Sequence, residues 1–230
     1  MAPARNPLVA LGLLRRDAPK TVAGFRRWRE IIDTDGAVPG RIKRLFVACA
    51  ATVKGYQEMA LRELMAAREA GLSEEEAGAA VAILSSVRGE GAALRFHGFF
   101  RQAYPEAVDP AAPEDDLIVE PGAAEANFLH YFGTMPPSLG KLFDVKPLGA
   151  DAYYLMREGT LSGTALGPVH AELLLVTILV ADYSDWSKVH MNGARKAGAS
   201  EEAVAEAVIC AVPTAGLSAW VIGATAMDAG

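Results

Sequence analysis

The segment AAREAGLSEEE at residues 66–76 returns in altered form as GARKAGASEEA at residues 193–203. In both copies a helix-forming run ends at a glycine, Gly71 or Gly198, which can take the left-handed conformation that closes a helix. A serine follows two residues later and suits the N-cap of a second helix, and the glutamates after it favour the positive end of that helix. Each copy therefore predicts a tight helical hairpin.

The similarity extends beyond the hairpin. Residues 51–81 align without gaps on residues 178–208, a shift of 127 positions, and 11 of the 31 aligned residues are identical. Self-similarity of this kind is typical of tandem structural units. We therefore predict two tandem helical repeats, with an N-terminal repeat at 1–104, a proline- and acid-rich linker at 105–122, and a C-terminal repeat at 123–230.

The fold class predicted for the whole chain is all-α. Strand signals are weak, because no sustained alternation of apolar and polar residues joins turn dipeptides. Ala, Leu and Glu, which favour helices, are prominent. Helices are expected at residues 19–33, 41–70, 74–88, 90–102, 122–133, 148–159, 168–181, 183–197, 201–213 and 217–227.

Composition limits the expected partners and compartment. The 230 residues carry a net charge of -6, and acidic proteins repel phosphate backbones, so no nucleic acid partner is expected. Residues 207–227 are uncharged and long enough to span a bilayer, but they are rich in small residues, contain Pro213 and lack basic anchors. We expect a buried helix pair broken near Pro213 to Gly216 and no membrane association. Arg15 and Arg16 follow the short N-terminal apolar stretch, so we expect no signal peptide and a cytoplasmic protein.

The cysteine and histidine patterns argue against metals and cofactors. Cys49 and Cys210 lie far apart, each inside an apolar run, and we expect buried, inert thiols rather than a disulfide framework. The sequence has no HExxH motif, no His–Cys cluster, no paired carboxylates at metal-binding spacing and no glycine-rich phosphate loop. We therefore expect neither a metal nor a cofactor.

The residues around His190 carry a family resemblance. Glu172-Leu-Leu-Leu, followed by His190-Met-Asn-Gly-Ala-Arg-Lys-Ala-Gly198-Ala-Ser-Glu-Glu, resembles the carboxymuconolactone decarboxylase and alkylhydroperoxidase D family. That family's pattern is a Glu-Leu, a mostly apolar helix, an optional Cys-x-x-Cys, a His separated from the second Cys by three residues, and a Gly-x-(Ser/Thr)-x-Glu turn eight residues after the His. The resemblance covers about residues 40–100 and 165–225, and it implies a helical fold.

The sequence departs from the family pattern at the redox positions. Tyr183 and Trp186 stand where the family has its two cysteines, and Glu172 is one residue closer to His190 than usual. A peroxidatic thiol pair is therefore absent. At the positions of the Glu, the two cysteines and the His, the first half has Arg44, Tyr56, Met59 and Glu63. Because the first half lacks all four pattern residues, we expect it to be a packing partner or a wall of the second half's pocket.

Glu172 and His190 form the candidate catalytic pair. They are 18 residues apart, which is about 27 Å along an unbroken helix, so they can meet only if the chain reverses between them. The resemblance implies such a break near residues 181–184. Glu172 would then hold His190 in one tautomer and leave the other ring nitrogen free for proton transfer. The alternatives are a structural histidine and a salt-bridged or interface carboxylate.

Four further residues complete the predicted site. A spacing of three and four residues places Tyr183, Trp186 and His190 on one helix face. Tyr183 is a candidate donor to a developing enolate or carboxylate oxygen, and Trp186 a candidate apolar wall of the substrate pocket. Tyr56 and Glu63 are candidate substrate-binding residues from the first half. Plain core aromatics, and a solvated helix face for Glu63, are the alternatives.

The resemblance implies a cofactor-free enzyme that decarboxylates a small carbonyl or carboxylate compound, or isomerises or cyclises it by proton transfer, with His190 as acid and base. Two alternatives stay open. One is an alkylhydroperoxidase-like antioxidant protein, against which the missing thiols argue. The other is a non-catalytic ligand-binding oligomer of the same fold. Because the family builds pockets between protomers and short hairpins leave apolar surface, we predict a homo-oligomer, a dimer or trimer.

Overall fold

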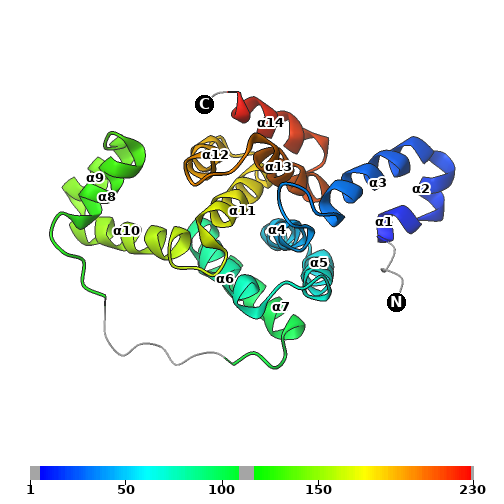
Figure 1. Ribbon diagram of the computed structural model, residues 1–230, viewed down its shortest axis with the longest axis horizontal. Coiled ribbons are helices and arrows are strands. Elements are labelled where there is room, and N and C mark those ends of the chain that lie inside the picture. Colours follow the sequence, from blue (N-terminus) through cyan, green and yellow to red (C-terminus); the bar gives the residue numbers. More distant parts are fainter. Residues whose placement is uncertain (1–5, 109–116, 229–230) are drawn as a thin grey trace.

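The computed structural model describes residues 6–108 and 117–228, and every regular element in these ranges is a helix (Figure 1). This confirms the all-α fold class. In chain order the helices are α1 (Pro7–Ala10), α2 (Gly12–Asp17), α3 (Pro19–Asp33), α4 (Gly40–Val53), α5 (Gln57–Glu69), α6 (Glu74–Arg88), α7 (Glu90–Ala103), α8 (Ala123–Phe132), α9 (Pro137–Val145), α10 (Pro147–Leu161), α11 (Gly167–Ala181), α12 (Ser187–Lys196), α13 (Glu201–Ala215) and α14 (Leu217–Met227).

Two predicted helices are shorter than expected, and each is interrupted by residues with left-handed or non-helical backbone. The helix expected at 41–70 is divided into α4 and α5, because Gly55 has a φ of 78° and Tyr56 lies outside the helical region. The helix expected at 183–197 begins only at Ser187, because Tyr183 has a φ of 57°. Helices α1, α2 and α9 were not expected from the sequence.

The two hairpins form as predicted. Gly71 has a φ of 91° and Gly198 a φ of 104°, so both occupy the left-handed region that ends a helix. The Ser73 hydroxyl accepts a hydrogen bond from the Glu76 backbone at the start of α6, and the Ser200 hydroxyl caps α13 in the same way. These turns join α5 to α6 and α12 to α13.

The two-repeat organisation stays a prediction. Helices α4 to α7 and α11 to α14 occupy corresponding places in the sequence; the bounds of α13 are those of α6 shifted by the same 127 positions as the sequence repeat. The expected linker at 105–122 lies partly outside the described residues.

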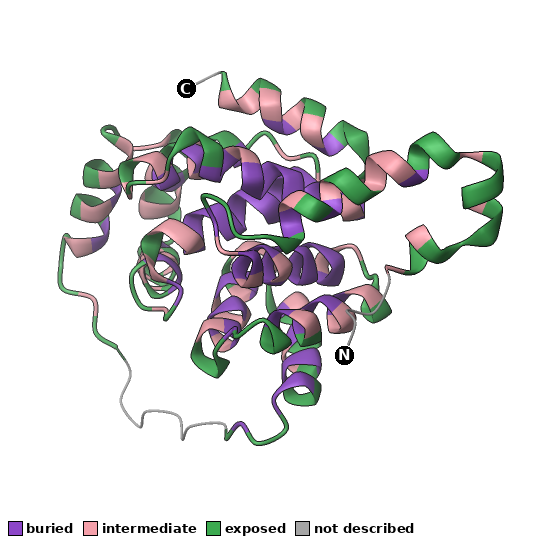
Figure 2. Cartoon of the chain, turned by 45° about the vertical axis from the view of Figure 1, so that its right-hand side comes forward, coloured by how far each residue is buried: buried purple, intermediate pink, exposed green. Residues whose placement is uncertain are grey.

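One hydrophobic core contains helices from both halves of the chain. The central α11 is buried at every residue from Ala171 to Ala181, and Figure 2 shows this helix and α4 as the most deeply covered part of the molecule. Helix α4 packs against both α11 and α13, while α10 reaches α6. Since each half completes the core of the other, α6 can contribute side chains beside α11.

The last two helices are separated at Gly216, within the stretch where the break was expected, but only the first of them is largely buried. Helix α13 continues through Pro213 to Ala215, and most of its residues are buried. Helix α14, in contrast, leaves Leu217 and Val221 largely exposed. In the described ranges, no helix combines the length and the apolar character that crossing a membrane requires.

Helices α8, α9 and α10 carry a second, small core made by Ala124, Phe128 and Leu139. We call these three helices the α8–α10 arm. Figure 1 shows α8 and α9 at the far end of α10, away from the central helices. The arm therefore has packing of its own, and it reaches the main body mainly through α10, which contacts α6 and α11.

Candidate active site

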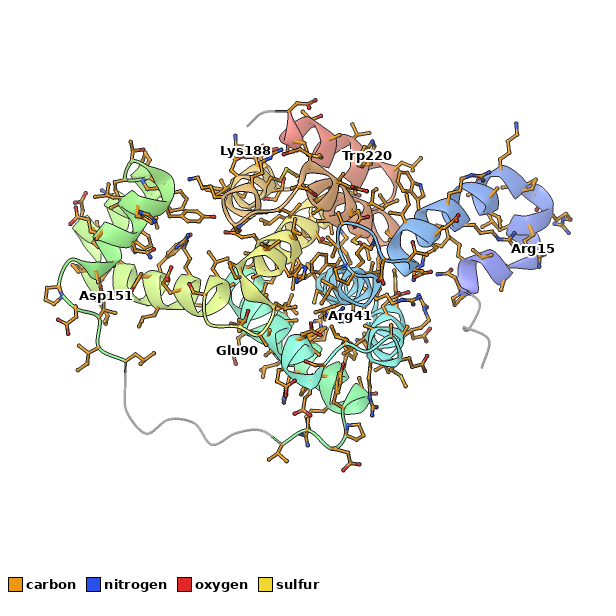
Figure 3. All side chains as sticks on the ribbon, viewed as in Figure 1. Arg15, Arg41, Glu90, Asp151, Lys188 and Trp220 are labelled. Carbon is orange, nitrogen blue, oxygen red and sulfur yellow. The ribbon has the colours of Figure 1, made fainter. Side chains whose placement is uncertain are left out.

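The chain reverses between Glu172 and His190, as predicted. Helix α11 ends at Ala181, a short turn follows, and α12 begins at Ser187. The reversal brings Glu172 Oε2 to 2.7 Å from His190 Nδ1. Figure 3 shows Lys188, two residues before His190, on the outer side of α12. Because a step of two residues turns about 200° around a helix, His190 faces inward, towards α11.

The Glu172–His190 contact is shielded from solvent. The Glu172 side chain is 3% exposed and that of His190 is 23% exposed. A carboxylate accepts hydrogen bonds, so the contact favours the tautomer of His190 that carries its hydrogen on Nδ1. In that tautomer Nε2 has a free lone pair and can take up a proton.

His190 lines a mostly apolar cavity of about 270 Å³ between the α8–α10 arm and helices α6, α11 and α12. Arg157 is its one permanently charged lining residue, and no lining residue is acidic, among the residues that the structure describes. The wall is made by Ser86, Val87, Tyr131, Phe132, Tyr153, Met156, Arg157, Thr160, Leu161, Leu175, Leu179, Trp186, Val189 and His190. The cavity thus suits a small apolar compound, and a negative charge on it would meet a guanidinium.

Tyr131, on α8, contacts the second oxygen of the Glu172 carboxylate. Its hydroxyl donates a hydrogen bond of 2.7 Å to Glu172 Oε1. Burial, followed by the nearby Glu172 carboxylate, raises the pKa of Tyr131 well above its ordinary value. The phenol therefore stays a hydrogen-bond donor over the physiological pH range.

Gly193, on α12, makes room for this contact. A Cβ atom at this position would lie 2.4 Å from both Glu172 Oε1 and the Tyr131 hydroxyl. Any larger residue would have to displace one of the two groups. The close approach of α12 to α11 and α8 therefore depends on the absence of a side chain here.

Arg157, on α10, is held beside Tyr131. Its guanidinium carbon lies 3.6 Å from the centre of the Tyr131 ring, a cation–π contact. Its Nη1 donates to Asn127 Oδ1 at 2.9 Å and to Glu158 Oε1 at 3.0 Å. With only 12% of its side chain exposed, Arg157 is fixed where it lines the cavity.

A second hollow of about 320 Å³ adjoins this group, and its wall includes Glu172, Gly193 and Lys196. Tyr131 and Arg157 line both spaces, whereas His190 lines only the first and Glu172 only the second. The Glu172–His190 pair therefore lies between the two spaces, with one partner in the wall of each.

Trp186 lies at the predicted site, but Tyr183 does not. Trp186 lines the cavity and is 62% exposed. The Tyr183 hydroxyl instead donates to the Ala215 carbonyl at 2.6 Å, and Tyr183 is absent from the cavity wall. The expected common helix face with His190 is wrong, because α12 begins after both aromatic residues.

The two candidate residues of the first half also lie elsewhere. Tyr56 precedes α5 and is 49% exposed. Glu63 is buried rather than solvated; its carboxylate binds Arg29 at 2.9 Å and Arg62 at 3.2 Å. Neither lines the cavity. The first half contributes Ser86 and Val87 of α6 instead.

Both cysteines are fully buried, as predicted. Burial raises the pKa of the Cys49 thiol and of the Cys210 thiol well above the ordinary value. A thiolate is the nucleophilic form, so neither residue is suited to attack a peroxide. Over the described ranges, no group of three or more His, Cys, Asp or Glu side chains is placed to hold a metal ion.

Sequence reasoning missed three residues of this group: Tyr131, Arg157 and Gly193. Tyr131 lies 41 residues before Glu172, and no spacing rule connects the two. Gly193 carried a usable signal, because a glycine inside an otherwise helical run points to close packing against another element. Ala66, the aligned residue of the first half, has a side chain at the same place in the pattern.

Comparison with known proteins supports the resemblance. No curated protein matches the chain. Residues 147–229 match the model of the Carboxymuconolactone decarboxylase family, a range that includes α10 to α14 and so contains both Glu172 and His190. Residues 147–229, and the candidate pair within them, are therefore similar to the carboxymuconolactone decarboxylase family.

Proposed function

We propose that this protein is a cofactor-free acid/base enzyme that acts on a small, mostly apolar carbonyl or carboxylate compound, with Nε2 of His190 as the atom that moves the proton. One observation carries the proposal: the 2.7 Å contact between Glu172 and His190 at the edge of a cavity of about 270 Å³. A buried carboxylate on one ring nitrogen orients the imidazole and leaves the lone pair of the other nitrogen available for proton transfer.

In the isomerisation form of the reaction, Nε2 removes a proton from a carbon beside a carbonyl group. The electron pair of the broken C–H bond passes into the enolate, and the imidazolium returns the proton to a different carbon. In the decarboxylation form, the bond to the carboxylate carbon breaks and CO₂ leaves. The remaining carbanion then takes a proton from Nε2–H, and water restores that proton. Glu172 stays ionised in both forms and stabilises the imidazolium.

Two other cavity residues have roles in this proposal. Arg157 supplies the positive charge that would attract a substrate carboxylate or stabilise an enolate oxygen. Trp186 covers the cavity mouth with an apolar surface and limits the access of water. Tyr183, Tyr56 and Glu63 have no part in it, because their side chains lie outside the cavity wall.

The test is a panel of small 3-oxo acids and unsaturated lactone carboxylates, followed by proton NMR in heavy water for loss of CO₂ or exchange of a carbon-bound hydrogen. We expect turnover of at least one compound, and a loss of at least 100-fold in kcat/KM for His190→Ala. His97→Ala on α7 is the matched control and should retain activity. Full turnover by His190→Ala would contradict the assignment.

Two other functions are separable from this one. An alkylhydroperoxidase-like activity needs a reactive thiol, so peroxide consumption that disappears in a Cys49→Ala/Cys210→Ala variant would support it. A ligand-binding oligomer would bind members of the panel without converting any of them.

We further propose that the protein is a cytoplasmic homodimer or homotrimer. A single 24.3 kDa species in sedimentation at micromolar concentration would contradict the oligomer.

A further inference from the structure

Tyr131 is the residue through which the α8–α10 arm contacts Glu172 of the candidate catalytic pair. It lies on α8, outside the segment that matches the family model. Three groups from other helices hold it. Its hydroxyl binds Glu172 on α11, its backbone carbonyl accepts a 2.9 Å hydrogen bond from Lys196 Nζ on α12, and Arg157 on α10 lies over its ring.

The two oxygens of the Glu172 carboxylate contact different partners. Oε2 contacts His190 and Oε1 accepts from Tyr131, each at 2.7 Å. A carboxylate held at one oxygen can still rotate about its last side-chain bond, whereas one held at both oxygens has a single orientation. Glu172 lines the second hollow, yet only 3% of its side chain is exposed, so its oxygens depend mainly on protein partners.

The arm that carries Tyr131 is packed as a separate unit. Its small core, with Phe128 at the centre, is distinct from the main core. Helix α8 itself packs on α10 rather than on α11 or α12. Tyr131 itself packs against the main core, and its hydrogen bonds with Glu172 and Lys196 add polar links between α8 and the helices of the catalytic pair. These contacts therefore depend on how the arm is seated on the body.

We propose that Tyr131 is a positioning residue: it fixes the Glu172 carboxylate in the orientation that holds Nδ1 of His190, and it makes this arrangement depend on the seating of the α8–α10 arm. The inference rests on the proposed role of the Glu172–His190 pair. It adds that Tyr131, which lies outside the residues that match the family model, controls whether His190 is kept in the tautomer with Nε2 free. Tyr131 acts through Glu172 and need not touch the substrate.

The test follows the Nδ1-bound hydrogen of His190 in the free protein, so it needs no substrate. A hydrogen held between Nδ1 and a buried carboxylate gives a separate downfield proton NMR signal, which His190→Gln assigns by removing it. In Tyr131→Phe we expect exchange of this hydrogen with water to accelerate about tenfold or more, because a charge-assisted hydrogen bond to the carboxylate is lost. Tyr153→Phe is the matched control on the same arm and should leave the exchange rate unchanged.

The outcomes separate this inference from the proposed function. An unchanged exchange rate in a folded Tyr131→Phe variant would overturn the positioning role and leave the Glu172–His190 pair intact. Absence of the signal from the wild-type protein would overturn both. If Tyr131→Phe does not fold, Gly193→Ala gives the second test, because its methyl group would force Tyr131 and Glu172 apart. Acceleration in that variant supports the inference, and the wild-type rate contradicts it.

Discussion

Substitution of Gly193 by alanine should destabilise the protein even though alanine is the better helix former. A Cβ atom there would lie 2.4 Å from Glu172 Oε1 and from the Tyr131 hydroxyl, and 2.6 Å from Glu172 Cδ. Overpacking of this kind costs about 1–3 kcal/mol, and loss of a hydrogen bond to a charged group about 1.5–3 kcal/mol. The higher helix propensity of alanine offsets about 1 kcal/mol of this loss of stability. At the middle of these ranges, the free energy of unfolding should fall by about 3 kcal/mol.

The assay is urea unfolding followed by far-ultraviolet circular dichroism, together with the Tm, which should fall by roughly 5–15 °C for a chain of this size. Gly98→Ala is the matched control. Gly98 also lies inside a helix, α7, but an added Cβ would meet nothing within 4 Å. This variant should gain up to about 1 kcal/mol. A Gly193→Ala protein as stable as the wild type would refute the close packing of α12 against Glu172 and Tyr131.

Three further predictions concern charges and thiols away from this contact. Glu63→Gln should lower the free energy of unfolding by about 1.5–3 kcal/mol in urea titrations, because the buried Arg29 loses one of its two carboxylate partners and keeps only Asp33; an effect below about 1 kcal/mol would favour a solvated Glu63. Cys49 and Cys210 should resist a thiol reagent in the native protein and react after denaturation, since burial raises both pKa values; rapid native labelling would contradict this. Burial lowers the pKa of His170 below its ordinary 6.5. Below about pH 6.5, His170 therefore binds a proton more readily in the unfolded chain than in the native protein, and the free energy of unfolding should fall as the pH drops through 6.5. The urea midpoint should fall more in the wild type than in His170→Gln between about pH 7.5 and 5.5, and equal falls would contradict it.

Local sequence signals predicted most of the fold because they act over a few residues. The glycine and serine of each hairpin determine where one helix ends and the next begins, and both turns form as expected. The interruption at Gly55 was missed, since a glycine inside a helical run marks a break only when packing requires one. Tyr183 was assigned to a helix for a related reason: few residues other than glycine take a positive φ, so its conformation has no residue-type signal.

The candidate site was likewise predicted only where local sequence signals act. The family pattern predicted the contact of Glu172 with His190, because it fixes the chain reversal between them. Tyr131 and Arg157 could not be found in this way, since their positions depend on how the arm packs on the body, over long sequence separations. The opposite error occurred at Glu63, where the spacing matched the site but a buried ion pair with Arg29 occupies the carboxylate.

The proposed function requires that Glu172 holds His190 with its hydrogen on Nδ1 and leaves Nε2 free to accept a proton. Nitrogen-15 NMR of the histidine rings, at a pH where this imidazole is neutral, distinguishes the two tautomers. We expect a protonated Nδ1 and an unprotonated Nε2 for His190, and a loss of this preference in Glu172→Gln. A wild-type ring with its hydrogen on Nε2, or a preference that persists in Glu172→Gln, would contradict it.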